Sequence, residues 1–245
     1  MNTVVNGESV AVVTGGSSGI GKATVAVLRK EGFRVASVDL TAGSEGDVDL
    51  SIAADVSDPD HVSTAVRGVL DVFGRIDVLV NNAGITGSAE ATVCHQTPVE
   101  EWDRVIAVNV RGAFLCSRAV LPVMLAQGSG HVITVASSAG VVAFPGRCAY
   151  TASKGGALML AKSIAVDYAA LGIRSNAVCP GFVQTPMTQW RLDVPELKAR
   201  VERNIPMGRV AQPEEIADAI SVLASGRMAY MTGHALLIDG GWTAL

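Results

Sequence analysis

A glycine-rich turn, TGGSSGIG at residues 14–21, constrains this chain more than any other segment. The apolar run at residues 9–14 before it has the character of a buried strand, and a helical run follows from about residue 20 to residue 31. Glycine lets the backbone turn tightly, and the helix that begins there points free N–H groups at the turn. This strand–turn–helix context predicts a pyrophosphate-binding site. Its predicted members are Gly15, Ser17, Ser18, Gly19, Ile20 and Gly21.

The same alternation of short apolar runs and longer helical runs continues along the whole chain. Apolar runs without strict alternation are typical of strands that are covered on both faces. The pattern predicts an α/β fold with a doubly wound parallel sheet, and one Rossmann-type domain over residues 1–245, because no linker or repeat divides it. The predicted strands are residues 9–14, 33–39, 77–81, 131–137, 174–179 and 235–239, and the predicted helices include residues 20–31, 97–125 and 149–170.

Asp39 ends the second apolar run, 18 residues after Gly21. A carboxylate at this place can accept hydrogen bonds from both hydroxyls of an adenosine ribose, and it would repel a 2′-phosphate. No Arg or Lys lies within residues 40–50 to offset that repulsion, so the sequence predicts NAD rather than NADP. Asp55 and Val56 are candidates for holding the adenine.

Residues 183–207 break the strand–helix rhythm. They contain three prolines, many charges, and two helix-like pieces around Trp190 and Leu197. The segment follows the carboxyl end of a predicted strand, where ligand crevices form in sheets of this kind. This position favours a mobile substrate lid over a surface excursion without a role.

Composition excludes several classes of function. The formal net charge is -4 and no long basic run occurs, so a nucleic acid is not an expected partner. The first nine residues are polar, without an apolar signal core, and Arg, Ser or Gly interrupts the apolar stretches, so we expect a cytoplasmic protein without a membrane span. No CxxC or HxxxH spacing occurs, so no metal site is expected and Cys94, Cys116, Cys148 and Cys179 are interpreted as reduced, small apolar residues.

Tyr150 and Lys154 stand four residues apart in a helical run, and therefore share one face of the helix. A tyrosine hydroxyl normally has a pKa near 10, too high for a base at neutral pH. An ammonium group at about 4 Å, with an effective dielectric constant of about 20, would stabilise the tyrosinate by roughly 4 kcal/mol and lower that pKa by about three. The pair is therefore a candidate general acid and base for exchanging an alcohol and a ketone.

Further motifs surround this pair. Ser137 closes a predicted strand 13 residues before Tyr150, and Asn109 lies in the run IAVNVRGAF. Asn-Asn-Ala-Gly at residues 81–84 and Pro-Gly at residues 180–181 each end a predicted strand. In combination these motifs are highly specific, and nearly the whole chain resembles the short-chain dehydrogenase/reductase family.

The resemblance implies a role for each of these residues. Ser137 would hold the substrate oxygen, and its distance from the tyrosine favours it over the neighbouring Ser138. Tyr150 would move the proton, Lys154 would bind the nicotinamide ribose and lower the tyrosine pKa, and Asn109 would support a water that links Lys154 to solvent. The family further implies a homotetramer or, less often, a dimer. Its implied cofactor contacts are Asn82, Ala83, Gly84, Pro180, Gly181, Val183 and Thr185, with Tyr150 and Lys154.

Two arginines bear on the substrate. Arg147 lies three residues before Tyr150 and Arg191 lies in the predicted lid. Together they could clamp a sulfonate, carboxylate or phosphate, while each alone is more often a solvated residue or the partner of a carboxylate such as Asp193.

A closer resemblance runs through residues 81–110 and both arginine segments. It is to dehydrogenases of bacterial epoxide metabolism, which act on 2-hydroxyalkyl thioether sulfonates derived from coenzyme M. It implies that Arg147 and Arg191 hold the sulfonate. Met187 and Trp190 could cover the apolar middle of such a substrate, or could belong to the core of the lid.

Two other functions stay open at this point. A 3-oxoacyl-carrier-protein reductase or a general ketone reductase would share the motifs, although such enzymes usually prefer NADP, against which Asp39 argues. A non-catalytic protein that senses NAD is a different class, since the fold alone does not establish catalysis. The intact set of Asn109, Ser137, Tyr150 and Lys154 argues against the sensor.

Overall fold

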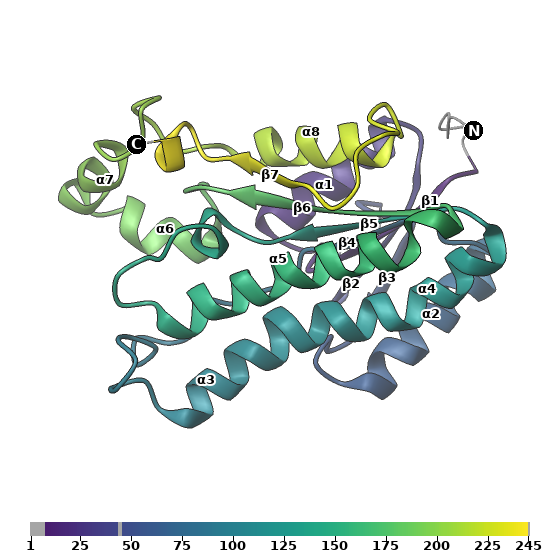
Figure 1. The fold of residues 1–245 in the computed structure, drawn as a ribbon, viewed down its shortest axis with the longest axis horizontal. Helices are drawn as coiled ribbons and strands as arrows, with labels where there is room; N and C mark the ends of the chain where they lie inside the picture. The colour runs from purple at the N-terminus through teal and green to yellow at the C-terminus, as the bar shows by residue number, and fades with distance from the viewer. Residues whose placement is uncertain (1–7, 44–45, 245) are drawn as a thin grey trace.

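The computed structural model describes residues 8–43 and 46–244, and within them seven strands form one parallel sheet (Figure 1). Their order is β3-β2-β1-β4-β5-β6-β7, and each neighbouring pair is parallel. The predicted doubly wound parallel sheet is therefore confirmed. The strands are β1 Val10–Thr14, β2 Arg34–Asp39, β3 Leu50–Ala53, β4 Val78–Asn81, β5 Gly130–Val135, β6 Ile173–Pro180 and β7 Ala235–Ile238.

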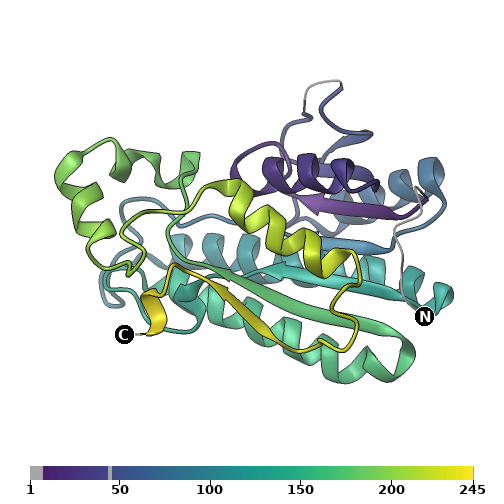
Figure 2. The same ribbon diagram turned by 90° about the horizontal axis from the view of Figure 1, so that it is seen from above.

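Helices cover both faces of the sheet (Figure 2). On one face, α1 and α8 bury side chains such as Leu28 and Ile220 against the strands. On the other face, α2, α4 and α5 contribute Val69, Met124 and Ile164 to a second core cluster. The main helices are α1 Gly19–Lys30, α2 Pro59–Phe73, α3 Val99–Ile106, α4 Ala113–Gln127, α5 Cys148–Tyr168 and α8 Pro213–Ala224.

The predicted elements agree with these bounds to within a few residues, except that the pattern missed β3. That strand has only four residues, three of them half-buried, and it lies at the edge of the sheet. A short edge strand carries little of the apolar signal that marks a strand buried on both faces. Between β6 and α8, the two predicted helix-like pieces are present as α6 Pro186–Leu192 and α7 Pro195–Glu202.

The helix through residues 99–127 is continuous but not uniform. A π-helical segment, η1 Ala107–Gly112, joins α3 to α4. By length and composition alone this run, Val99–Gln127, is long and apolar enough to cross a membrane, but half of its most apolar stretch is buried in the protein. Such burial is typical of a core helix, so the length is weak evidence for a membrane span.

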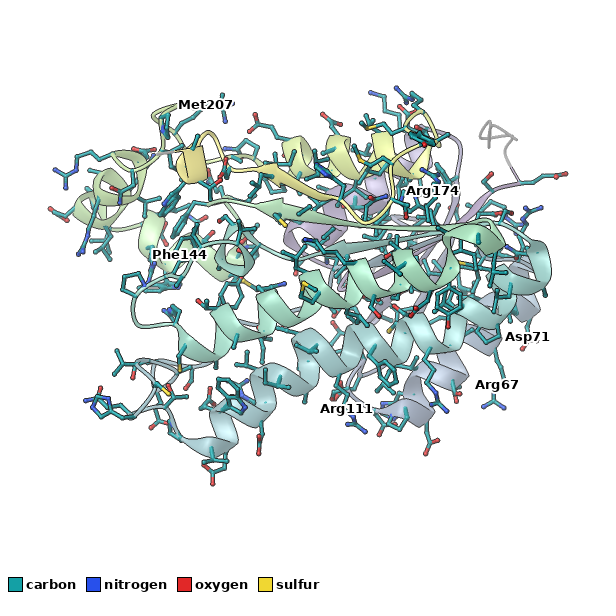
Figure 3. The ribbon with its side chains drawn as sticks, viewed as in Figure 1. Arg67, Asp71, Arg111, Phe144, Arg174 and Met207 are labelled. Atoms are coloured by element: carbon teal, nitrogen blue, oxygen red, sulfur yellow. The ribbon has the colours of Figure 1, made fainter. Side chains whose placement is uncertain are left out.

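The strand order reverses between β1 and β4, which both begin crossovers to opposite sides of the sheet. A crevice forms outside the carboxyl ends of the strands at such a point. Phe144 and Met207 lie at this end of the molecule with α6 and α7, whereas Arg174, at the amino end of β6, lies at the opposite end (Figure 3). The candidate site is therefore built where β1, β4, β5 and β6 end.

Candidate active site

A cavity of about 500 Å³ opens at the carboxyl ends of the strands. It extends from the end of β2, through the glycine turn, to α5 and the first turn of α6. Most residues that the sequence predicted for cofactor binding meet at its wall. They are Gly15, Ser18, Gly19, Ile20, Asp39, Asp55, Val56, Asn82, Ala83, Gly84, Tyr150, Lys154, Pro180, Gly181, Val183 and Thr185.

The glycine turn leaves no room for side chains at two positions. Gly15 has a φ of 65°, a left-handed conformation that glycine adopts without strain, and a Cβ there would lie 2.9 Å from the Cα of Ala83. A Cβ on Gly21 would collide with the carbonyl oxygen of Gly15. Asn82 fastens the turn from the neighbouring strand, since its Nδ2 donates to the carbonyls of Thr14 and Gly15 at 2.9 and 3.1 Å. The backbone that would face a pyrophosphate is thus fixed by direct packing.

Two predicted members of this turn stand behind the cavity wall rather than on it. Gly21 packs against Gly15, as described above, because the helix must pass close to the turn. Ser17 donates its backbone N–H to Oδ2 of Asp39 at 3.0 Å and its hydroxyl to the carbonyl of Thr41 at 3.2 Å. Ser17 and Gly21 therefore support the turn and Asp39 from behind the wall.

Asp39 and Asp55 are held in defined orientations on the cavity wall. Oδ1 of Asp39 accepts from the backbone N–H of Leu40 at 2.7 Å, in addition to its bond from Ser17. Oδ1 of Asp55 accepts from both the N–H and the hydroxyl of Ser57, at 2.8 and 2.7 Å. Each carboxylate keeps lone pairs for a ligand, because a carboxylate can accept about four hydrogen bonds.

Ser137, Tyr150 and Lys154 come together at the other end of the same cavity. The hydroxyl of Ser137 accepts from the N–H of Ala139 at 3.0 Å and also bonds to the hydroxyl of Tyr150. Nζ of Lys154 donates to the carbonyl of Val135 at 2.9 Å and lies 5.7 Å from the centre of the Tyr150 ring. The predicted reacting group is therefore assembled from the end of β5 and the first two turns of α5.

Asn109 is buried beside this group without lining the cavity. Its Oδ1 accepts from the N–H of Ile85 and its Nδ2 donates to the carbonyl of Ile85, both at 2.8 Å, while Nδ2 also reaches the hydroxyl of Ser153 at 2.9 Å. A Cβ on Gly84 would lie 3.2 Å from Oδ1 of Asn109 and 3.3 Å from Nζ of Lys154. Asn109 thus fixes the loop after β4 and stands next to the lysine.

The electrostatics of the pair differ from the sequence prediction. Burial raises the pKa of Tyr150, and the hydrogen bond with Ser137 and the charge of Arg147 only partly oppose this. Burial also lowers the pKa of Lys154 to about 8. The predicted lowering of the tyrosine pKa by Lys154 is not found in this arrangement, because the ammonium is turned toward the carbonyl of Val135 and both groups are desolvated.

A smaller cavity of about 100 Å³ adjoins the first and shares Ser137, Tyr150 and Met187 with it. All residues predicted to touch the substrate line this second space: Ser137, Arg147, Tyr150, Met187, Trp190 and Arg191. The sequence reading missed other members of the wall, namely Thr86, Phe144, Gly181, Phe182 and Thr188, although it had placed Gly181 at the cofactor. For Phe144 and Phe182, the sequence signal was their place beside recognised motifs: Phe144 lies three residues before Arg147, and Phe182 directly follows Pro180-Gly181.

Arg191 rests on aromatic rings instead of a carboxylate. Its guanidinium lies 4.8 Å from the ring centre of Trp190 and 5.9 Å from that of Phe182. Partial burial and the nearby charges of Arg147 and Arg200 lower the pKa of Arg191. Within the described residues no carboxylate forms an ion pair with either Arg147 or Arg191.

The alternative that Asp193 neutralises Arg191 is not supported, since Oδ1 of Asp193 accepts from Nε2 of Gln189 at 2.7 Å. Among residues 8–43 and 46–244, no group of His, Cys, Asp and Glu side chains could hold a metal ion.

Comparison with known proteins defines the class. The family described as enoyl-(acyl carrier protein) reductase matches residues 15–243. The 2-(R)-hydroxypropyl-CoM dehydrogenase of Xanthobacter autotrophicus is 52% identical over 96% of this chain and 99% of its own length. A 3-oxoacyl-[acyl-carrier-protein] reductase of Thermotoga maritima is 41% identical over 95% of this chain and 96% of its own. A crystal structure of a short-chain type dehydrogenase/reductase from Mycobacterium marinum superposes with a TM-score of 0.92 at 33% identity, covering 100% of this chain and 98% of that one.

The chain belongs to the short-chain dehydrogenase/reductase family, as the resemblance predicted. It is an oxidoreductase whose relatives act on CH–OH groups, and enzymes of this family typically use a nicotinamide cofactor.

Proposed function

We propose that this enzyme oxidises a secondary alcohol to a ketone with NAD, reversibly, and that its substrate is a 2-hydroxyalkyl thioether sulfonate such as 2-(R)-hydroxypropyl-coenzyme M. The observation that carries the proposal is the junction of two cavities at Ser137 and Tyr150. One cavity runs to Asp39, and the other ends among two arginines that lack a carboxylate partner. The identity of 52% to a dehydrogenase of that name supports the substrate.

The residues of the larger cavity fit a nicotinamide dinucleotide. The glycine turn packs so closely that a diphosphate could lie against backbone N–H groups at the start of α1. Asp39 would accept the ribose hydroxyls, and its charge favours NAD over NADP. Asp55 and Val56 would hold the adenine, and residues 180–185 would flank the nicotinamide. When bound, the cofactor supplies a hydride acceptor or donor, while the protein aligns the reacting carbon.

The chain's own side chains would handle the proton. In oxidation, the deprotonated oxygen of Tyr150 accepts the proton of the substrate hydroxyl, and in reduction the Tyr150 hydroxyl donates its proton to the carbonyl oxygen. Ser137 donates a hydrogen bond to the same substrate oxygen and so fixes its position. Lys154 binds the nicotinamide ribose through its ammonium group, and Asn109 supports a water between Lys154 and solvent.

The second cavity would hold the rest of the substrate. Arg147 and Arg191 lie close enough to influence each other's charge, and a sulfonate between them would relieve that repulsion. Met187 and Trp190 would cover the thioether. Both lie on α6, the start of the 183–207 segment, which we propose acts as a lid over the bound substrate.

The experiment compares kcat/KM for two thioether alcohols that differ only in the sulfonate: 2-hydroxypropyl-coenzyme M and its ethyl thioether analogue, each as separate enantiomers, with NAD and with NADP. We expect wild type to prefer NAD and the sulfonate. Arg147→Ala and Arg191→Ala should each lower kcat/KM for the sulfonate by about 10- to 100-fold, as expected for charged hydrogen bonds. The neutral analogue should be unaffected. Arg67→Ala on α2, far from the site (Figure 3), is the matched control.

Equal turnover of both thioethers by wild type would refute the sulfonate clamp. The identity of 41% to a 3-oxoacyl-carrier-protein reductase makes that activity the second candidate, and a preference for NADP and a 3-oxoacyl thioester would establish it. Tight binding of NADH without turnover of any alcohol or ketone would instead indicate a sensor.

We further propose that the enzyme acts as a homotetramer in the cytoplasm. The outer surfaces of α4 and α5 support the assembly, because Phe114, Met159 and Val166 are 47%, 60% and 83% exposed there. Apolar side chains gathered on neighbouring helices favour association between copies of a chain.

A further inference from the structure

Trp242 lies directly behind the wall of the smaller cavity. Its indole stacks on the ring of Phe182, with 5.2 Å between ring centres and an angle of 11° between the planes. It also packs on Phe144, at 5.1 Å and 37°. Phe144 and Phe182 both line the cavity, whereas Trp242 belongs to the short helix η4 Trp242–Ala244 near the carboxyl end of the chain. One residue outside the site therefore contacts two residues of its wall.

The turn that carries Trp242 is firmly fixed. The carboxylate of Asp239 accepts from the N–H groups of Gly241 and Thr243, at 3.0 and 2.9 Å, and from the hydroxyl of Thr243 at 2.6 Å. Gly240 and Gly241 have φ angles of 65° and 88°, in the left-handed region that favours glycine. The N–H of Met207 donates to the carbonyl of Gly240 at 3.1 Å. The turn therefore holds the indole at a defined place and ties it to the segment after α7.

An aromatic chain links the two arginines through this indole. The guanidinium of Arg191 lies over Phe182, Phe182 stacks on Trp242, and Trp242 packs on Phe144. Phe144 stands three residues before Arg147 in the loop that precedes α5. Figure 3 shows Phe144 at the end of the molecule where Figure 1, in the same view, labels α6 and the carboxyl terminus. A path of ring contacts thus runs from Arg191 through Trp242 to the loop that carries Arg147.

Trp242 also supports the helical segment from behind. It packs against a small apolar cluster formed by Val201, Ile205 and Val210, at the end of α7 and just beyond it. Removing the indole would leave a void between this cluster and the two phenylalanines, and packed side chains move to fill such a void. Both α6 and α7 would lose the indole surface that lies between their apolar cluster and the loop before α5.

We propose that Trp242 is a positioning residue that sets the spacing between Arg147 and Arg191, and so determines how well the enzyme selects substrates with an anionic end. This inference rests on the proposed function, because it assumes that the arginines bind the anion. A misplacement of about 1 Å is enough to cost up to about 100-fold in binding or rate. The effect should therefore appear in recognition of the anionic end and not in the proton transfer at Tyr150.

The test measures KM and kcat with the same pair of thioethers for wild type, Trp242→Ala, Trp242→Phe and Trp102→Ala. Trp102 lies on α3 outside both cavities and is the matched control. Trp242→Ala should raise KM for the sulfonate about tenfold, a moderate part of what misplacement can cost. It should leave kcat and the neutral thioether within about twofold, and Trp242→Phe should restore most of the loss because a ring again fills the space. An equal loss on both thioethers, or none on either, would overturn the proposal.

Hydrogen exchange of the substrate-free protein separates this inference from the proposed function. Trp242→Ala should speed amide exchange in α6 and α7 but not in α1, whereas Trp102→Ala should leave α6 and α7 unchanged. Unchanged exchange in the folded Trp242→Ala variant would overturn the positioning role, whatever the substrate is. If wild type turns over both thioethers equally, the sulfonate substrate is refuted but the positioning role of Trp242 is not. Amide exchange in α6 and α7 then tests that role by itself.

Discussion

The two halves of the site are built in different ways. The cofactor half is made from backbone at the ends of buried strands, and glycines there have no space for a Cβ. The substrate half is made from side chains on α6 and the loop before α5, where Met187 and Trp190 are 41% and 53% exposed. Main-chain geometry shared by a whole fold fixes the first half, and a few aromatic contacts fix the second. The reaction can therefore stay constant while the substrate changes.

Tyr150 stands where the two halves meet, so its replacement should have the largest effect. Tyr150→Phe removes the hydroxyl that is proposed to exchange the proton, and kcat should fall by about 10²- to 10⁴-fold for the sulfonate and the neutral thioether alike. NADH binding, followed by fluorescence, should stay unchanged. A loss restricted to the sulfonate would show that Tyr150 belongs to the substrate half alone.

The pH dependence sharpens the same prediction. Burial raises the pKa of Tyr150, so the base form needed for oxidation becomes abundant only as pH rises into the alkaline range. In wild type, kcat/KM for oxidation should increase on the alkaline side while that for ketone reduction decreases. Tyr150→Phe should lack both trends in its residual activity.

The tight packing of the cofactor half predicts a smaller, selective loss for Gly21→Ala. The added methyl would collide with the carbonyl of Gly15, and overpacking of this kind costs about 1–3 kcal/mol. The dissociation constant of NADH should rise by about 5- to 100-fold, and the KM for either thioether at saturating NAD should change little.

Gly68→Ala is the control for that change. Gly68 lies inside α2, where a Cβ would meet only Cδ1 of Ile52 at an ordinary 3.4 Å. Alanine is favoured over glycine in a helix by up to about 1 kcal/mol, so this variant should be slightly more stable and bind NADH normally. If Gly21→Ala also bound NADH normally, the cofactor half would be more adaptable than its packing indicates.

Replacement of Lys154 is predicted to change stability with the opposite sign, since losing this side chain should stabilise the fold at neutral pH. Burial lowers its pKa to about 8, below the usual 10.5, so the unfolded chain binds more protons between these values and stability should rise with pH there. Lys154→Met removes this cost of about 3 kcal/mol at neutral pH but loses a hydrogen bond worth about 1 kcal/mol.

Thermal unfolding from pH 7 to pH 10 measures this balance. The inactive Lys154→Met variant should be more stable than wild type at pH 7, and the difference should shrink toward pH 10. A variant that is less stable at every pH would mean that the lysine contributes to the fold of the cofactor half and does not weaken it.

The sequence predicted which residues meet in the larger cavity because most of their signals are local. The glycine turn, Asp39 and the Tyr150–Lys154 pair each depend on spacing within one strand–helix unit. The contacts of the substrate half join Phe144, Phe182 and Trp242, which are far apart in the chain and meet only because β5, β6 and β7 are neighbours. The direction in which the Lys154 ammonium points, and with it the tyrosine pKa, also depended on tertiary packing.

The π-helical segment between α3 and α4 changes the direction in which the faces of one long helix point. A π turn accommodates one residue more than an α turn, so the faces on its two sides are offset by about 100°. Upstream, Glu101 can therefore accept from the N–H of Ser88 at 2.9 Å, while Gly112 at the end of η1 packs against Val56 in the wall of the larger cavity. Deleting one residue of η1 would rotate one of these two contacts out of register, so the extra residue lets a single long helix keep both.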